Sequence, residues 1–283
     1  MDFSSLEIFC TVAEEGSVTR AAQRLNRVQS NVTTRVQQLE EQLNVALFQR
    51  EGKRMELTAE GQRFIDYAQR LLSLAQEAMQ SVNTAQPIGQ LKIGAMEATA
   101  ASRLPLPLAA FHANWPDVVL EISTGTSRQL LDEVAHHRLD CALVAIAPGE
   151  LPATLADNLS GVAIWSEQLM LLEPKNAGGG KALSLAAFGP GCTYRAAGEE
   201  WFRQQAPKGV QVIEAHSYHA IMACVATGTC AAVMPQSVLD LYKNMKARFK
   251  ASPLQKMDTW LVWRGQYKSA ALDALRDVCA AHG

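Results

Sequence analysis

No proline occurs in the first 86 residues, which are rich instead in Gln, Arg, Glu, Leu and Ala, a composition that favours helix. Pro87 and Gly89 end this stretch, and short β-rich runs alternate with helical runs beyond them, as in a mainly parallel α/β sheet. The 283 residues suffice for about two domains. The missing proline therefore predicts a helical N-terminal part and a domain boundary near residue 87.

The chain also lacks C-x-x-C pairs, long apolar runs and a large net charge. Its six cysteines form no such pair, so we expect reduced thiols in a cytoplasmic protein rather than a disulfide framework. No apolar run approaches the ~20 residues of a membrane helix. Glu14 and Glu15 interrupt the first apolar stretch, which argues against a signal peptide. Because the formal net charge is −2, any nucleic-acid site must be a local patch.

What the N-terminal part does contain is the pattern of a helix-turn-helix. An amphipathic helix ends at Gly16, Ser17 caps a helix over 18–25, and a turn at 26–28 leads into a helix over 29–43. The segments 46–48 and 55–57 flank a basic tip, which predicts a β-hairpin wing. From residue 18 to residue 54 seven basic residues outnumber three acids, a local charge of +4. This excess lies where contacts to DNA phosphates are needed.

The first turn of the second helix of such a motif enters the major groove. Gln and Asn can bond adenine bidentately, and Thr can contact a thymine methyl. Val32, Val36 and Leu39 are spaced to face the core, which leaves the polar positions for DNA. A solvated helix face explains the charge taken alone, but not the charge together with the helix pattern. The predicted DNA-binding residues are Arg27, Gln29, Ser30, Asn31, Thr33, Thr34, Arg35, Arg50, Lys53 and Arg54.

Thr58 is placed to cap a long helix that runs to about residue 86. Its apolar positions are spaced by 4, 3, 4, 3 and 4 residues, a heptad seam that predicts pairing with a second copy of the chain. The alternative is that the helix packs on its own domain. The predicted dimerisation seam consists of Phe64, Ala68, Leu71, Ala75, Ala78 and Val82.

Residues 88–283 predict a two-lobed α/β domain. Lobe I comprises about 88–161 and 259–283, lobe II about 162–258, and crossover strands join them. The glycines of 176–181 predict a surface turn. We expect strands over 91–95, 118–123, 139–146, 164–172, 210–214, 230–234 and 259–264, and helices over 99–113, 127–137, 198–205, 217–226, 236–242 and 269–281.

Ligands of such folds bind between the lobes, beyond the C-terminal ends of the strands, where helix N-termini point. Hydroxyls at three strand-to-helix junctions suit a carboxylate or another small polar ligand. Arg195, from the opposite lobe, has a guanidinium that matches a carboxylate. Each Ser or Thr could instead be a helix cap, and Arg195 a member of a surface ion pair. The predicted effector-binding residues are Thr99, Ser102, Thr126, Ser127, Tyr194, Arg195, Ser217, Tyr218 and His219.

No catalytic constellation is evident, and we expect no enzyme activity, no metal and no cofactor. His216 and His219 have the spacing of metal ligands, but no third ligand is evident nearby. Cys192 has no base paired with it in the sequence, so a core or loop thiol is expected rather than a nucleophile. Two rivals remain: a metabolite-binding protein or enzyme whose N-terminal helices serve only dimerisation, and an architectural DNA binder. The basic wing argues against the first and the α/β domain against the second.

Three strings carry a resemblance to the LysR-type transcriptional regulators: LEIFCTVAEEGSVTRAAQRL, VQSNVTTRVQQLEEQLNVALFQR and LTAEG. The resemblance implies an all-α winged helix-turn-helix (1–58), a linker and dimerisation helix (59–87) and a two-lobed, periplasmic-binding-protein-like effector domain (88–283). It also implies a homo-oligomer, usually a tetramer built as a dimer of dimers. Such a protein binds double-stranded promoter DNA, answers to a small molecule and can contact RNA polymerase.

The chain departs from the family pattern at two positions. The family commonly has a small capping residue at Val28 and an Arg at Thr34, so its base preferences are not carried over; Arg27 and Arg35 can supply positive contacts instead. The strings RVQSNVTTR, MEATAASRLP, CTYR and SYHAIMACVATG are similar to a subgroup that regulates putrescine utilisation. We therefore expect a cytoplasmic, sequence-specific transcriptional regulator that responds to a small polar, carboxylate-bearing metabolite.

Overall fold

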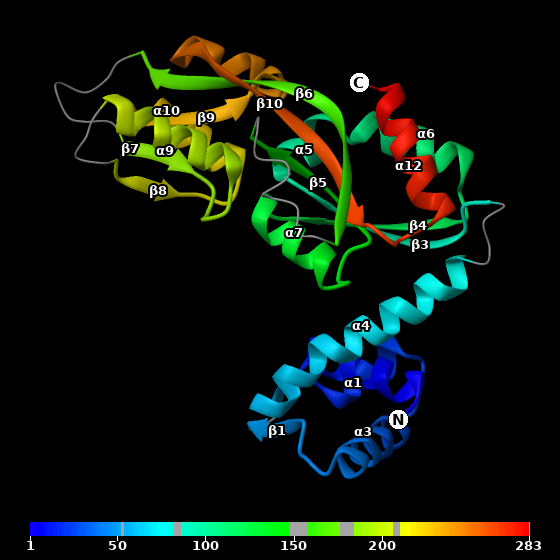
Figure 1. Cartoon of the computed structure of the whole chain (residues 1–283). Coiled ribbons are helices and arrows are strands. Elements are labelled where there is room, and N and C mark those ends of the chain that lie inside the picture. The colour runs from blue at the N-terminus through cyan, green and yellow to red at the C-terminus, as the bar shows by residue number, and fades with distance from the viewer. Residues whose placement is uncertain (52–53, 82–85, 148–157, 176–183, 206–209, 283) are drawn as a thin grey trace. The chain divides into compact units, whose positions relative to one another are not determined.

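The computed structural model describes residues 1–51, 54–81, 86–147, 158–175, 184–205 and 210–282. They belong to two compact units, one comprising residues 1–82 with 136–138 and the other the rest of the chain (Figure 1). The first unit is built around one hydrophobic core and the second around two. Among the described residues no helix is both long enough and apolar enough to span a membrane.

The first unit is a winged helix-turn-helix followed by a long helix. Its helices end where the sequence places special backbone conformations: Gly16 closes α1 at φ 58° and Asn44 closes α3 at φ 52°. Thr58 accepts a hydrogen bond from the Gly61 N–H (3.0 Å) and so caps the long helix. The elements are α1 (Phe3–Glu15), α2 (Val18–Arg24), α3 (Gln29–Leu43), β1 (Phe48–Glu51), β2 (Arg54–Leu57) and α4 (Ala59–Ser81).

The core of this unit joins the helix-turn-helix to the wing and to α4. The Phe9 ring lies 5.3 Å from the rings of both Phe48 on β1 and Phe64 on α4. Gly61, in the first turn of α4, is required by close approach, because a Cβ there would overlap the carbonyl oxygen of Leu47. The start of α4 is therefore an integral part of the first unit.

The second unit is built on one eight-stranded sheet in the order β4-β3-β5-β10-β6-β9-β7-β8. The parallel pairs lie at its two ends, and β6 and β10, each of 16 residues, pair antiparallel through the middle. These two strands pair with β5 in lobe I and with β9 in lobe II, so they join the lobes. The strands are β3 (Gly89–Ala95), β4 (Val118–Thr124), β5 (Cys141–Ile146), β6 (Leu159–Pro174), β7 (Ser184–Ala187), β8 (Val212–Glu214), β9 (Cys230–Pro235) and β10 (Phe249–Arg264).

Helices cover both lobes (Figure 1). Lobe I carries α5 (Glu97–Ser102), α6 (Pro105–Asn114), α7 (Ser127–Ala135) and α12 (Ala270–Ala281). Lobe II carries α9 (Thr193–Gln205), α10 (Tyr218–Ala226), α11 (Gln236–Leu239) and the 3-10 helix η1 (Asp240–Arg248).

Several sequence expectations need correction, among them the strand expected over 259–264, which begins at Phe249. The helix expected over 99–113 is two helices, because Pro105 begins α6 and cannot continue α5. Strand β7 was not expected, since its Ser-Leu-Ala-Ala sequence contains no β-branched residue. Helix α9 begins at Thr193, five residues before the expected start at 198. The turn expected at 176–181 lies outside the described residues.

Candidate DNA-binding surface and effector pocket

The first turn of α3 presents polar side chains to solvent. Gln29, Ser30, Asn31 and Thr34 are exposed, while Val32, Val36 and Leu39 face the core. Thr33 is half-buried, and its hydroxyl donates to the carbonyl of Gln29 (3.1 Å). Four of the five predicted side chains of this turn are therefore available to bases, and the fifth is held by its own helix.

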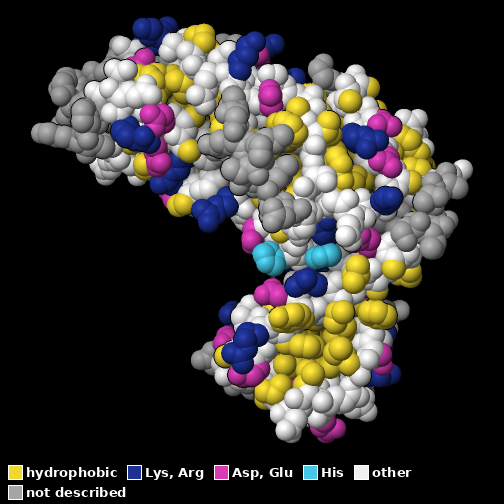
Figure 2. Space-filling model, viewed as in Figure 1, with side chains coloured by type: hydrophobic (Ala, Val, Ile, Leu, Met, Phe, Trp, Pro, Cys, Tyr) yellow, Lys and Arg dark blue, Asp and Glu magenta, His cyan; other side chains and the backbone are white. Residues whose placement is uncertain are grey.

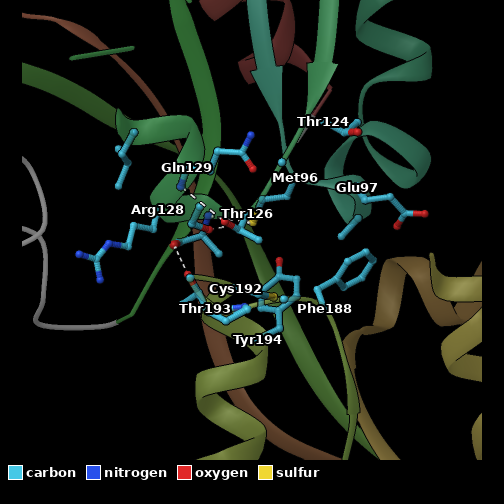
Figure 3. A pocket seen from close by; sticks show the side chains of 18 of the residues that line it. Met96, Glu97, Thr124, Thr126, Arg128, Gln129, Phe188, Cys192, Thr193 and Tyr194 are labelled. Carbon is cyan, nitrogen blue, oxygen red and sulfur yellow. Dashed lines mark hydrogen bonds between the residues drawn. The ribbon is translucent and has the colours of Figure 1, made fainter. Parts of the chain in front are cut away.

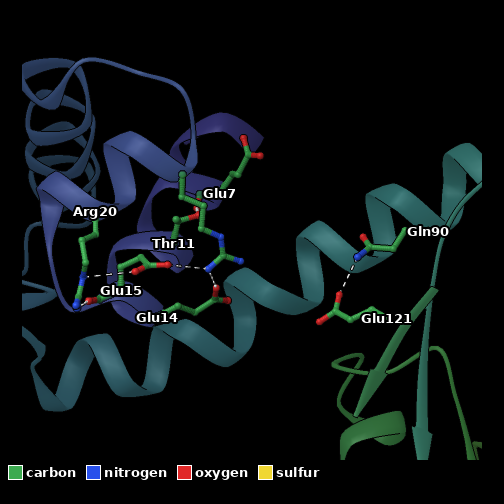
Figure 4. A network of polar contacts seen from close by, with 8 residues as sticks. Glu7, Thr11, Glu14, Glu15, Arg20, Gln90 and Glu121 are labelled. Atoms are coloured by element: carbon green, nitrogen blue, oxygen red, sulfur yellow. Dashed lines mark hydrogen bonds and ion pairs between the residues drawn. The ribbon is translucent and has the colours of Figure 1, made fainter. Parts of the chain in front are cut away.

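Ion pairs occupy several of the arginines that make this segment basic. Arg24 binds Glu14 (2.8 Å) and Glu15 (3.2 Å), and Arg20 also contacts Glu15 (Figure 4). Arg35 binds Asp2 (3.2 Å), so it ties α3 to the start of α1. Because these pairs are exposed, each contributes little to stability and can be exchanged for a phosphate.

The remaining predicted cations have different surroundings. Arg27 and Arg54 are exposed and form no ion pair with any described residue. The wing is shorter at its tip than expected, because residues 50 and 54 belong to the strands: Arg50 pairs with Met55, and Glu51 with Arg54. The side chain of Arg50 and the whole of Lys53 lie outside the described part of the chain.

The expected seam on α4 is divided between two environments. Phe64 is half-buried and Ala68 fully buried in their own unit, so the first turns of α4 pack on their own domain. The exposed apolar side chains of α4 are instead Tyr67 (62 %), Leu71 (38 %), Leu74 (53 %) and Met79 (67 %). Figure 2 shows hydrophobic side chains gathered along this helix. Ala75 is half-buried, Ala78 is exposed, and Val82 lies outside the described residues.

A cavity of about 1270 Å³ lies between the two lobes of the second unit. It is lined at the C-terminal ends of β3, β4 and β7 and at the starts of α5, α7, α9 and α10, which is where open α/β sheets bind ligands. Figure 3 shows Met96, Thr126 and Gln129 from lobe I and Phe188, Cys192, Thr193 and Tyr194 from lobe II around it. The cavity is thus formed by segments that are far apart in the sequence.

The lobes touch directly beside this cavity. The Arg128 N–H donates to the Gly191 carbonyl (3.3 Å), and the Thr193 hydroxyl donates to the Ala145 carbonyl (2.9 Å). Gly191 has φ +87°, and a Cβ there would lie 3.0 Å from the Cβ of Arg128. A glycine is therefore needed for the two lobes to approach this closely.

Four of the nine predicted effector-binding residues line the cavity: Thr126, Ser127, Tyr194 and Tyr218. Thr126 and Ser127 also have internal roles, since the Thr126 hydroxyl accepts from the Gln129 N–H (3.4 Å) and the Ser127 hydroxyl donates to the Met96 sulfur (3.3 Å). Burial raises the pKa values of Tyr194 and Tyr218, so both stay neutral phenols that can donate or accept hydrogen bonds.

The other predicted residues do not line the cavity. Thr99 is buried in α5, and the Ser102 hydroxyl donates to the Ala98 carbonyl (2.7 Å). Ser217 caps α10 by accepting from the Ala220 N–H (3.3 Å). His219 Nδ1 shares a hydrogen bond with the Tyr242 hydroxyl (2.9 Å). For Ser217 the structure shows the helix-capping role that was the alternative to ligand contact.

Arg195, expected to face the ligand, also lies elsewhere. Its guanidinium donates to the carboxylates of Glu199 (2.7 Å) and Glu214 (3.4 Å) and to the Phe188 carbonyl (3.2 Å). It does not line the cavity. The cation that does line it is Arg128, which is exposed at the start of α7 and forms no ion pair with any described residue.

Sequence reasoning missed several lining residues besides Arg128. Glu97 and Gln129 come from strand-to-helix junctions that the sequence does indicate, whereas Phe188 follows β7, the strand that was not expected. Cys192 also lines the cavity, and burial raises the pKa of its thiol, which disfavours the reactive thiolate. Within the described ranges no group of three or more His, Cys, Asp or Glu could hold a metal ion.

Comparisons with known proteins agree with both units. The helix-turn-helix of bacterial regulatory proteins of the lysR family matches residues 3–62, and the LysR substrate binding domain matches residues 84–283. The HTH-type transcriptional regulator YofA of Bacillus subtilis is 36 % identical over 243 residues, 85 % of this chain and 83 % of that protein. The full-length structure of OxyR from Pseudomonas aeruginosa is similar with a TM-score of 0.72 at 22 % identity, over 100 % of this chain and 99 % of that one. That of CbnR in complex with its target DNA has a TM-score of 0.68 at 22 % identity and covers 100 % of both chains.

A winged helix-turn-helix with a separate two-lobed ligand-binding domain defines a DNA-binding transcriptional regulator that carries an effector domain. Since the two domain matches together span most of the sequence, the chain belongs to the LysR family. Its relatives are transcriptional regulators rather than enzymes. The putrescine-utilisation subgroup stays a prediction.

Proposed function

We propose that the chain is a sequence-specific regulator that reads promoter DNA with the first turn of α3 and responds to a small polar, carboxylate-bearing metabolite bound between the lobes. The observation that carries this proposal is the lining of the cavity, which includes Arg128 together with the hydroxyl of Thr126 and the amide of Gln129. A guanidinium beside hydroxyl and amide donors is the chemistry that binds a carboxylate. Arg128 takes the role that the sequence suggested for Arg195.

In this proposal, ligand binding changes how the protein binds DNA by changing the angle between the two lobes. A carboxylate bound at Arg128 would lie beside the contact between Arg128 and Gly191, so it favours the arrangement in which the lobes touch. A change in lobe angle can then alter the spacing of the DNA-binding units in an oligomer. We propose a homotetramer built as a dimer of dimers, in which the exposed line of Tyr67, Leu71, Leu74 and Met79 on α4 pairs with a second copy.

The same proposal places the protein in the cytoplasm, where promoter DNA and RNA polymerase are its further partners. Membership of the putrescine-utilisation subgroup is part of it, and rests on the four strings quoted above.

The test is a thermal-shift screen of the full-length chain against a library of small metabolites with and without a carboxylate, followed by titration calorimetry of the hits. We expect Arg128→Gln to weaken binding of a carboxylate hit by about tenfold or more, because a charged hydrogen-bond partner is lost. Arg203→Gln, a charge removal on the exposed face of α9, should leave it unchanged. Hits that carry no carboxylate, or equal affinity in the Arg128 variant, would contradict the proposed effector class.

A further inference from the structure

One carboxylate oxygen at the cavity is buried without a hydrogen-bond partner. Glu97 is the first residue of α5 and lines the cavity, and its Oε2 has no partner among the described atoms. Desolvation raises the pKa of Glu97, opposed by the Tyr218 backbone N–H and by His219. No Lys or Arg of the described chain pairs with it. A buried carboxylate oxygen that lacks a donor is costly, so this position favours a ligand that brings one.

Aromatic rings accompany this carboxylate. Phe188 and Tyr218 line the same cavity, and their ring centroids lie 5.1 Å apart at 72°. Figure 3 shows Phe188 and Glu97 on the same side of the cavity. Aromatic faces beside a carboxylate are the surroundings that bind an ammonium group, through cation–π attraction and a charge-assisted hydrogen bond.

The opposite side of the cavity has the opposite charge. Figure 3 shows Arg128 and Gln129 across the cavity from Glu97. The other acid that lines the cavity, Asp132, already has a partner, whereas Arg128 forms no ion pair with any described residue. The cavity therefore presents an unpaired carboxylate on one side and an unpaired guanidinium on the other, and a ligand with a single sign of charge cannot satisfy both.

We propose that the effector is an amino carboxylate, with its ammonium bound at Glu97 beside the ring of Phe188 and its carboxylate bound at Arg128. Because the two groups lie on opposite sides, the charges of the ligand are separated by several atoms. This inference rests on the proposed function and narrows it. Glu97 is then the residue that makes the cavity prefer amino acids to plain carboxylates, because a plain carboxylate brings no donor for the buried Glu97 oxygen.

The test is calorimetric titration of the full-length chain. The probes are the common α-amino acids and the ω-amino acids from β-alanine to 6-aminohexanoate. Each hit is compared with the alkanoate that lacks its ammonium and the alkylamine that lacks its carboxylate. We expect at least one amino carboxylate to bind, and each truncated analogue to bind about tenfold or more weakly.

The isosteric variant Glu97→Gln tests the ammonium site at Glu97 separately from the carboxylate site at Arg128. This variant should weaken binding of the amino carboxylate by about tenfold or more and leave the affinity for the matched alkanoate unchanged. Glu200→Gln, which removes a half-buried carboxylate of α9 that pairs with Arg203 and does not line the cavity, should change neither affinity. If alkanoates bind as tightly as amino carboxylates and Glu97→Gln has no effect, the ammonium subsite is overturned while a carboxylate effector stands. If only the alkylamines bind, both the carboxylate effector and the amino carboxylate are contradicted. If none of the probes binds, the amino carboxylate proposal is overturned.

Discussion

The surface around the first turn of α3 and the cavity between the lobes differ in where their residues come from. The DNA-binding surface is drawn from one stretch of sequence, and its polar side chains are exposed and mostly independent of one another. The cavity takes residues from segments near 97, 126, 190 and 217, and several of its polar groups also hold the two lobes together. Substitutions on the surface should therefore change DNA binding alone, whereas those in the cavity should also change stability.

The helix that leaves the DNA-binding unit gives the largest expected effect. Leu71→Glu puts a carboxylate into the exposed apolar line of α4, and burying it at a dimer interface costs several kcal/mol or separates the two copies. We expect dissociation in sedimentation and loss of operator affinity, with the fold of each unit retained. Gln62→Glu adds the same charge on an exposed position of α4 and is the matched control. If the Leu71 variant keeps the oligomeric state of the wild type, this face of α4 is not the dimer interface.

A second substitution tests whether the start of α4 belongs to the DNA-binding unit. In Gly61→Ala the new Cβ overlaps the backbone at Leu47, and overpacking of this kind costs about 1–3 kcal/mol. Hydrogen exchange should show faster amide exchange in α1 to α4, with β5 and β6 as protected as in the wild type. Gln62→Ala should change neither unit. Equal loss of protection in both units would mean that they do not unfold separately.

Base reading and phosphate binding can be separated on the surface itself. Gln29→Ala should remove a contact to a base edge and reduce discrimination between sequences by about 1–3 kcal/mol. Arg27→Ala should weaken binding to all sequences and reduce the slope of log affinity against log salt by about one. The measurement is a salt series with specific and scrambled duplexes. The two roles are misassigned if Arg27→Ala alters preference and Gln29→Ala alters the salt slope.

The first unit could be predicted closely, because its signals are local. Ser17, Gly16 and the period of Val32, Val36 and Leu39 placed the helices, and α3 has the expected bounds. The α4 seam was less predictable, because an apolar stripe does not show whether its partner is the same domain or another copy. Phe64 and Ala68 meet their own core, whereas Leu71 does not.

The cavity was only partly predictable, because its residues meet through the order of the strands. Glu97 and Arg128 follow β3 and β4, which are neighbours in the sheet, but Phe188 reaches the same place from lobe II. The position of Arg195 outside the cavity lining had a local signal. Glu199 lies four residues after Arg195, the spacing of an ion pair on one helix face, and it takes the guanidinium that was assigned to the ligand.

The smallest expected effect is a pH-dependent change in stability at the cavity. Burial raises the pKa of Glu97 in the folded chain above the usual value of 4.5, so ionisation of Glu97 destabilises the fold as the pH rises. Glu97→Gln should therefore raise the melting temperature near neutral pH, and the gain should vanish as the pH falls below the usual carboxyl pKa. Glu200→Gln should show no such dependence. A variant less stable than the wild type at pH 7 would contradict burial as the dominant cause.

The central claim is that the first turn of α3 reads DNA sequence, and sequencing of bound genomic fragments tests it most directly. Sheared DNA from the source organism is incubated with the full-length protein, and the recovered fragments are compared for the wild type, Gln29→Ala and Arg203→Gln. We predict that the wild type and Arg203→Gln enrich the same few sites in promoter regions, and that Gln29→Ala spreads over other sites. Uniform recovery by the wild type, or identical sites for the Gln29 variant, would contradict the account.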